Sequence, residues 1–442
     1  MQSSTDLLSE AYTVLDNNDR SEYTEPANGL YPHQWFWDSC FIAIGLRHRD
    51  VIRAQQELLS LAKGQWQNGM VPNIIFNNEA RYTADRNVWR SWVSPYAPDG
   101  VATTGITQPP MLAEAIFQIG EKLTWTERKN WYEQIYPTLL KYHQWLYRER
   151  DPHQEGLVLQ IHPWEVGMDN TPPWMSELHE HQLNWWIRAI RATKADKIIN
   201  MIRRDTRHIP NGQRFDTIES LAMFDIQRRL RRKAYDINRI LDHSMFAIED
   251  VAFNAILIRN NELLQHIAKS LKRDVPKELS ASMHRTRQAF NQLWDPQTNQ
   301  FYSRDFITHR LIKVSSVGSI IALYSGCISA DQAQRLVHLL ADKHAYMTNF
   351  PVPTVSISSP WYNPDNYWQG PAWININWLL IDGLKRYGYL QPAAKLRHQT
   401  LNMVSNSGCF EYFNPETGNG IGVDNFSWTA ALAIDLALNP IV

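Results

Sequence analysis

Residues 371–387, PAWININWLLIDGLKRY, and residues 391–406, QPAAKLRHQTLNMVSN, decide the fold. In both segments apolar side chains recur at the three- and four-residue spacing of a helix, and a short turn separates the two. Such neighbouring helices recur along most of the chain, whereas alternating strand patterns are scarce. We predict about twelve helices in six sequential pairs, at residues 36–48, 50–63, 108–121, 126–149, 247–258, 261–272, 277–294, 314–325, 330–342, 371–387, 391–406 and 426–438.

Some of the predicted helix ends carry recognisable residues. Pro109 and Pro110 are expected to open the third helix, because a missing backbone N–H costs nothing in the first turn. Asp50 and Ser427 stand where an N-cap side chain could accept a hydrogen bond from the helix backbone.

The connections between the predicted helices are long and rich in aromatic residues, Pro and Gly. Loops of this length within one compact protein are usually functional. A stretch at about 179–240 is helical but highly charged, which is typical of an inserted cap. No fixed repeat and no Gly/Ser-rich or Pro-rich linker divides the chain. We therefore predict an all-α fold, one closed helical barrel over residues 1–442, in which residues 150–245 contribute a lid; the long connections are 64–107, 150–178, 343–370 and 407–425.

Composition excludes several classes of protein. There are 44 Lys and Arg residues against 45 Asp and Glu residues, so no basic surplus exists for phosphate contacts or for an anionic membrane. We expect neither nucleic acid nor membrane as a partner. The N-terminal segment is charged and lacks the apolar core of a secretory signal. Three cysteines without metal-type spacing suggest a reducing compartment, so we expect a cytoplasmic protein; they are Cys40, Cys327 and Cys409.

The first dense aromatic segment is Tyr31–Ser39, YPHQWFWDS. Asp38 could be a helix-start carboxylate beneath a hydrophobic staple, which would be a structural role. The alternative is a platform for a sugar, since Trp rings stack on apolar C–H faces while a carboxylate accepts hydroxyl hydrogen bonds. The density of aromatic residues favours the platform.

A second segment, His162–Trp174, HPWEVGMDNTPPW, combines acids, Trp and Pro in a loop. It could be an ordinary turn with solvated carboxylates. Between two Trp residues, however, Asp169 would be partly desolvated, and desolvation raises a carboxyl pKa as a general acid requires. His162 stands alone and is more often structural than a metal ligand in such a position.

Two further segments lie near the C-terminus. In Asn363–Asn375, NPDNYWQGPAWIN, the Gly-Pro step is expected to start a helix at Pro371, although aromatic packing at a helix entry would explain the composition equally. In Cys409–Gly420, CFEYFNPETGNG, Glu411 is enclosed by aromatic residues and is either a satisfied structural group or a base.

Together these loops offer two carboxylates, Asp169 and Glu411, that are remote in the chain and each in aromatic company. Glycoside hydrolysis needs such a pair, one acid for the leaving oxygen and one carboxylate for water or the anomeric carbon. The sequence contains no phosphate loop, no dinucleotide-binding glycine turn and no serine nucleophile elbow. The histidines have no metal-type spacing.

These motifs, in this order and spacing, resemble glycoside hydrolase family 63, in its compact bacterial branch of mannosylglycerate and glucosylglycerate hydrolases. The resemblance covers nearly the whole chain, through Gln34–Ser39, Asp99–Val101, Gly105–Pro110, Glu165–Asn170, Tyr367–Trp373 and Glu411–Gly418. It implies an (α/α)6 barrel, an inverting α-glycosidase with its active site at one mouth of that barrel, and no need for a metal or an organic cofactor.

The resemblance also implies roles for individual residues. Asp169 matches the general acid and Glu411 the general base, so their carboxyl groups should lie about 6.5–9.5 Å apart. Asp38, with Trp35 and Trp37, matches the wall that holds the glycosyl ring. Further pocket positions are matched by Tyr31, Gln108, Trp164, Gly167, Tyr367, Trp368, Gln369 and Trp373.

Two departures from the family concern the leaving group. Many relatives carry Arg where this chain has Gln369, and residues 81–86, RYTADR, replace a short aromatic-Pro-Gly loop. A glycerate leaving group would need a cation, for which Arg204 or Arg203 in the charged lid is the candidate; a solvated arginine is the alternative. Tyr82 could donate its hydroxyl to the same carboxylate.

The resulting hypothesis is hydrolysis of a small glycosylated solute, glucosylglycerate or mannosylglycerate. Two alternatives are an exo-acting α-glucosidase for a disaccharide such as trehalose or kojibiose, and a sugar-binding helical toroid without catalysis. The presence of both carboxylates argues against the toroid. The sequence indicates neither the gluco or manno configuration nor the oligomeric state.

Overall fold

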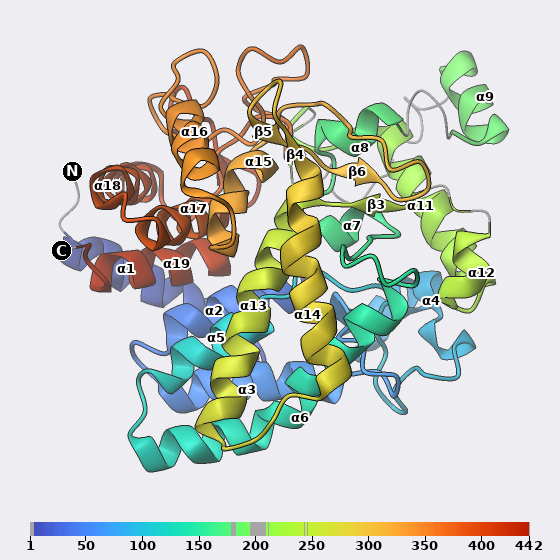
Figure 1. The fold of residues 1–442 in the computed structure, drawn as a ribbon, viewed down its shortest axis with the longest axis horizontal. Coiled ribbons are helices and arrows are strands. Elements are labelled where there is room, and N and C mark those ends of the chain that lie inside the picture. Colours follow the sequence, from blue (N-terminus) through green and yellow to red (C-terminus); the bar gives the residue numbers. More distant parts are fainter. Residues whose placement is uncertain are drawn as a thin grey trace.

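The computed structural model describes residues 4–177, 183–194, 209–210, 212–242, 244 and 246–441. In these residues two concentric layers of helices form an (α/α)6 barrel, which confirms the predicted fold class (Figure 1). The inner layer contains α2 (Phe36–Leu46), α5 (Leu112–Gly120), α13 (Val251–Ser270), α15 (Gly318–Ile321) with η6 (Ala322–Ser325), α17 (Ile374–Arg386) and α19 (Ser427–Leu438). The outer layer contains α1 (Ser4–Asn18), α3 (Val51–Lys63), α6 (Trp125–Glu149), α14 (Lys277–Ala289), α16 (Ala330–Leu340) and α18 (Leu390–Ser407).

The inner helices form a closed ring, because each contacts the next and α19 contacts α2. Every residue of α2 is buried, which explains its uniformly apolar sequence. A side chain at Gly45 would overlap the backbone of Ala431, so glycine is what allows α2 and α19 to approach this closely. The ring therefore joins the two ends of the chain.

Two features of the predicted helix list were wrong: it divided one helix in two, and it omitted α1. Residues 247–258 and 261–272 were expected to be separate helices, but α13 is a single helix. The polar residues at the supposed break are buried and bonded, since Asn260 accepts a hydrogen bond from the backbone N–H of Glu114 at 2.9 Å and Asn261 bonds to His143. The missing twelfth helix is α1, which packs on α19 through Leu7, Ala11, Val14 and Leu15.

Several inner helices begin later than predicted. The third helix begins at Leu112 rather than at the prolines, and α17 begins at Ile374 rather than at Pro371. The residues before α17 instead form an extended wall, in which Ala372 pairs with Phe413. Asp50 is the N-cap of α3, as predicted, whereas Ser427 is the first residue of α19 and follows the N-cap Phe426.

Short antiparallel strand pairs order the loops at the end where the inner helices begin. Gln34 of β1 (Gln34–Trp35) pairs with Ile75 of β2 (Ile74–Ile75), and Tyr412 of β7 (Tyr412–Phe413) pairs with Ile421 of β8 (Gly420–Ile421). β1 leads directly into α2. A third pair joins β4 (Trp294–Asp295) to β5 (Gln300–Phe301). These pairs hold aromatic loop residues at fixed positions beside the barrel mouth.

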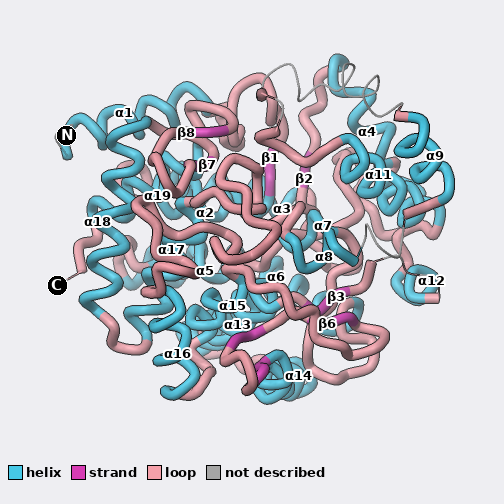
Figure 2. Tube along the Cα trace, turned by 90° about the horizontal axis from the view of Figure 1, so that it is seen from above, coloured by secondary structure: helices cyan, strands magenta, loops and turns pink. Residues whose placement is uncertain are grey.

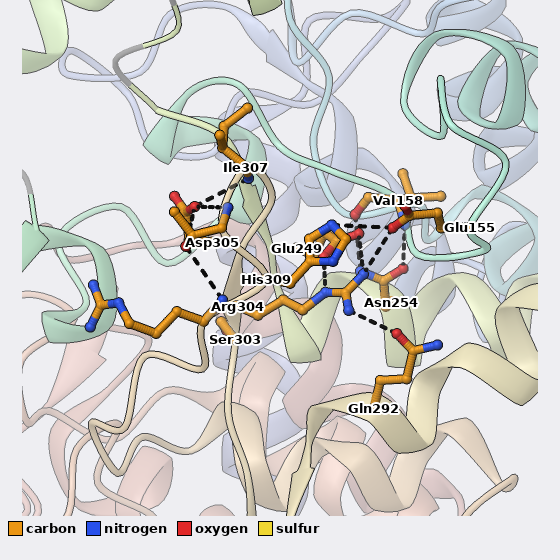
Figure 3. Close-up of polar contacts among 12 residues, drawn as sticks. Glu155, Val158, Glu249, Asn254, Gln292, Ser303, Arg304, Asp305, Ile307 and His309 are labelled. Atoms are coloured by element: carbon orange, nitrogen blue, oxygen red, sulfur yellow. Dashed lines mark hydrogen bonds and ion pairs between the residues drawn. The ribbon is translucent and has the colours of Figure 1, made fainter.

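A buried ion-pair cluster fixes the point where the chain enters α13. β3 (Ile248–Glu249) pairs with β6 (Arg304–Asp305), and the Arg304 guanidinium points into a group of acceptors formed by Glu249, Glu155 and Gln292 (Figure 3). Burial raises the pKa of Glu249 to about 7, while Arg304 acts in the opposite direction. The cluster lies apart from the cavity described below and has a structural role.

Four of the remaining described helices, α4, α9, α11 and α12, lie to one side of the barrel (Figure 2). Figure 2 shows α4, α9 and α11 together, far from α18, and α11 contacts both α4 and α9. None of the described helices is long and apolar enough to cross a membrane. These additional elements are η1 (Ala80–Tyr82), α4 (Thr83–Trp89), η2 (Ser91–Val93), α7 (Pro163–Val166), α8 (Pro172–Glu177), α9 (Trp185–Thr193), α11 (Thr217–Arg232), α12 (Ile237–Leu241) and η5 (Phe290–Leu293).

Candidate active site

A cavity of about 850 Å³ opens among the loops that precede the inner helices. Most of the predicted site residues line it, although they come from five separate parts of the chain. The predicted residues in its wall are Tyr31, Trp35, Trp37, Asp38, Gln108, Trp164, Gly167, Asp169, Tyr367, Trp368 and Glu411.

Asp169 follows a tight turn at the end of α7. Gly167 has a φ of +80°, and a side chain there would collide with Trp37, so this turn requires glycine. The Tyr367 hydroxyl donates to Asp169 Oδ2 at 3.3 Å, and Trp174 Nε1 donates to the Asp169 backbone oxygen at 3.0 Å. Burial raises the pKa of the Asp169 carboxyl well above its ordinary value, the Tyr367 hydrogen bond lowers it, and Glu411 raises it further. A carboxyl group with these surroundings is suited to donate a proton.

Glu411 lies directly before β7 and is buried. The Tyr31 hydroxyl donates to its Oε1 at 2.8 Å, and Arg214 Nη2 donates to Oε1 at 2.8 Å and to Oε2 at 2.9 Å. Burial raises the pKa of Glu411, whereas the charge and hydrogen bonds of Arg214 lower it. The two acids therefore have different surroundings, because Asp169 has a neutral partner and Glu411 a cationic one.

Arg214 was missed by the sequence analysis. It lies just before α11, and its guanidinium stands 4.4 Å from the centre of the Tyr367 ring and 5.2 Å from that of Tyr31. The predicted cations Arg203 and Arg204 lie outside the described residues. One arginine among many in a charged stretch has no local signal, apart from the neighbouring Phe215, which also lines the cavity.

Asp38 and two Trp residues form the floor. Asp38 lies in the first turn of α2, and burial raises its pKa well above the ordinary value, with further contributions from Glu411 and Asp169. Trp37 lies 6.2 Å from Trp368, centre to centre, at a tilt of 40°. The helix-start position proposed for Asp38 and its place on the cavity wall are thus both observed.

Three residues predicted for the pocket do not line it. Tyr82 is buried against His33, with ring centres 5.1 Å apart. Trp373 stacks on the back of Trp368 at 3.7 Å and contacts Tyr412 on its other face. Gln369 Nε2 donates to the Asn170 backbone oxygen at 3.1 Å and to Glu219 Oε1 at 3.3 Å.

Trp373 and Gln369 lie behind the cavity wall for the same physical reason. A loop sequence rich in Trp and Gln indicates a wall but not which of its layers faces inward. Trp373 holds the ring of Trp368 from behind, and Gln369 joins the Asp169 turn to α11. Both therefore support residues that do line the cavity.

No group of three or more His, Cys, Asp or Glu side chains in the described ranges is placed to hold a metal ion. His162, which was expected to be structural, accepts a hydrogen bond from the Trp164 backbone N–H and donates to the Met223 backbone oxygen at 3.1 Å. Burial lowers its pKa to about 3. It ties α7 to α11.

An (α/α)6 barrel whose mouth holds acidic and aromatic side chains in one cavity defines a glycoside hydrolase, and comparison with known proteins supports this class. The chain belongs to the mannosylglycerate hydrolase MGH1-like glycoside hydrolase domain family, whose sequence profile matches residues 31–429. This confirms the resemblance noted from the motifs.

Relatives of known activity are similar over nearly their whole length. A mannosylglycerate hydrolase of Thermus thermophilus is 36% identical over 96% of this chain and 99% of its own. One from Rubrobacter radiotolerans is 35% identical over 98% of this chain and 97% of its own. A glucosylglycerate hydrolase of Mycolicibacterium hassiacum is 30% identical over 98% and 97%.

Solved structures agree with these relatives. A glycoside hydrolase family 63 mannosylglycerate hydrolase from Thermus thermophilus, in complex with Tris and D-glycerate, is similar at a TM-score of 0.86 and 35% identity, over 97% of this chain and 99% of that one. A neutral trehalase from Saccharomyces cerevisiae is similar at a TM-score of 0.59 and 15% identity, over 94% of this chain and 73% of that one. The trehalase shares the fold.

Replacing Gln369 with Ala removes the amide that joins the Asp169 turn to α11. We expect backbone amides of residues 217–222 to exchange with solvent about two- to tenfold faster, as the loss of one net hydrogen bond implies. Hydrogen exchange followed by mass spectrometry measures this. Gln391→Ala, on an exposed position of α18, is the control. Unchanged exchange in the Gln369 variant would show that the amide does not hold α11.

Proposed function

We propose that this chain is an inverting α-glycosidase that hydrolyses a hexosyl glycerate, with mannosylglycerate and glucosylglycerate as the candidate substrates. One observation carries the proposal: two acids from distant loops, Asp169 and Glu411, line the same cavity, and only Glu411 has a cationic partner. Catalysis by inversion requires such a difference, since one carboxyl group must hold a proton while the other lacks one.

In the proposed reaction, protonated Asp169 gives its proton to the bridging oxygen as the bond to the anomeric carbon breaks. Glu411 accepts a proton from a water molecule that attacks the opposite face of the sugar. Asp38 binds hydroxyl groups of the hexose, and Trp35 and Trp37 pack against its apolar face. The product is released with inverted anomeric configuration.

The substrate assignment rests on the relatives and on charge. Mannosylglycerate and glucosylglycerate hydrolases are the relatives at 30% identity or more quoted above. A glycerate group carries a carboxylate, and Arg214 is the one Lys or Arg among the described residues that line the cavity. A cavity of about 850 Å³ accommodates a ligand of this size.

The proposal includes the lid and the compartment. Arg214, Phe215, Ser220 and Phe224 all belong to residues 150–245 and line the cavity, which supports a lid role for that segment within a single catalytic domain. The three cysteines are free, which supports the cytoplasmic assignment.

Incubation of the protein with α-mannosylglycerate and α-glucosylglycerate should release hexose and glycerate from at least one of them. Because inversion converts an α-linkage to a β-product, proton NMR in the first minutes should detect the β-anomer before mutarotation. Trehalose and kojibiose serve as neutral comparison substrates. Faster hydrolysis of either disaccharide, or initial release of the α-anomer, would contradict the proposal.

The two carboxyl roles can be separated with α-glycosyl fluorides, because fluoride leaves without a proton. Asp169→Asn should lower kcat/KM for the glycerate glycoside by about a hundredfold to ten-thousandfold but retain most fluoride hydrolysis. Glu411→Gln should lower both by a similar factor, since both reactions need an activated water. Steady-state assays on the two substrates measure this. Equal behaviour of the two variants would contradict the assigned roles.

The pH dependence of kcat/KM should be bell-shaped. Activity is lost at low pH when Glu411 becomes protonated and at high pH when Asp169 loses its proton. The Tyr367 hydroxyl lowers the pKa of Asp169, so Tyr367→Phe should move the alkaline limb to higher pH. The acidic limb, which belongs to Glu411, should move less. If the alkaline limb does not move, the group that titrates there is not Asp169.

A further inference from the structure

Donors from three residues surround the Glu411 carboxylate. Its Oε1 accepts from the Tyr31 hydroxyl and Arg214 Nη2, and its Oε2 accepts from Arg214 Nη2 and from the backbone N–H of Val423 at 3.4 Å. An ionised carboxylate offers about four lone-pair sites, so these donors leave little room for a water molecule. In this arrangement Glu411 is a poor acceptor for a proton from the nucleophile.

The ion pair with Arg214 also weakens Glu411 as a base. The side chains of Arg214 and Glu411 are 10% and 2% exposed, so solvent screens their attraction little. A base acts by accepting a proton, and a neighbouring guanidinium favours the form without the proton. Removing this cation from the carboxylate would restore both a free lone pair and the basicity of Glu411.

Arg214 is incompletely bonded in this position. Its Nε is buried without a hydrogen-bond partner, and its pairing with Glu411 uses Nη2. A carboxylate that meets the edge of a guanidinium accepts from Nε and Nη2 together, in the two-point geometry that arginine favours. Another carboxylate inside the cavity could therefore offer Arg214 a better partner than Glu411.

The rings around Arg214 allow such an exchange. Its guanidinium lies over the rings of Tyr31 and Tyr367, and its Nη2 also donates to the Tyr31 hydroxyl, so these contacts would hold the cation in the cavity when it leaves Glu411. Tyr367 also donates to Asp169, whose proton goes to the leaving group in the proposed mechanism. The guanidinium thus lies between the base and the residues that face the leaving group.

We infer that the carboxylate of the leaving group draws Arg214 away from Glu411 and so frees the base for water activation. This inference rests on the proposed function and extends it. Arg214 is then a specificity-determining residue that acts on turnover as well as on binding, because a glycoside without the carboxylate leaves the base paired. A neutral glycoside would bind but react slowly, whereas a glycoside with a carboxylate would release Glu411 from Arg214 and react faster.

The test uses an α-glycosyl fluoride, which has no organic leaving group, together with free D-glycerate. Water adds to the anomeric carbon, its proton goes to Glu411, and the C–F bond breaks to release fluoride. If glycerate beside the sugar takes Arg214, the rate of fluoride release should rise about tenfold in the wild-type enzyme, a factor in the range of a hydrogen bond to a charged group. Glycerol, which lacks the carboxylate, should not activate.

Arg214→Gln separates the inference from simple binding of glycerate. Without the guanidinium the base is unpaired, so this variant should hydrolyse the fluoride about tenfold faster than the wild type in the absence of glycerate, and glycerate should add nothing. Its kcat for the glycerate glycoside should fall less than its KM rises. Arg239→Gln, an exposed arginine on α12, is the matched control and should behave as the wild type.

Two results would overturn the inference. One is a wild-type enzyme whose fluoride hydrolysis glycerate leaves unchanged or only inhibits. The other is an Arg214→Gln protein that melts at the wild-type temperature yet hydrolyses the fluoride more slowly; Arg214→Lys, which keeps the charge, provides a second folded variant. An enzyme that hydrolyses neither the fluoride nor a glycerate glycoside would instead refute the proposed function.

Discussion

Closure of the inner helical ring between α19 and α2 is the constraint on which the site depends. The close approach of Gly45 and Ala431 brings the chain ends together, so that Tyr31 bonds Glu411 across 380 residues of sequence. α1 covers the same junction from outside. Without this closure, Asp38 and Glu411 would belong to different surfaces, and the three acids could not influence one another.

Once the ring is closed, desolvation acts on all three carboxyl groups, and their partners distinguish them. Burial raises the pKa of Asp38, Asp169 and Glu411 alike. Asp169 has a tyrosine hydroxyl as its partner, whereas Glu411 has a guanidinium. The same aromatic enclosure can therefore favour a protonated acid on one side and an ionised base on the other, which is the arrangement that hydrolysis with inversion uses.

The sequence predicted the fold class and most of the cavity wall, because apolar periodicity and aromatic loop composition are local signals. It failed where a long-range contact decided the outcome. The sequence predicted separate helices at 247–258 and 261–272, but α13 is continuous, and Asn260 and Asn261 within it are bonded to other helices. Trp373 and Gln369 resembled wall residues but lie behind it. Arg214 had no local signal, since its partner Glu411 is 197 residues away.

The barrel supplies a geometry that many chemistries can use, and the loops decide which one applies. A trehalase at 15% identity retains the fold at a TM-score of 0.59, while the family 63 structure at 35% identity reaches 0.86 over 97% of this chain. What distinguishes this chain must therefore lie in the segments around the mouth. Arg214 lies in one of these segments, where it forms an ion pair with Glu411 of another loop. Under the proposed function, the choice of leaving group and the protonation state of the base would depend on this one side chain.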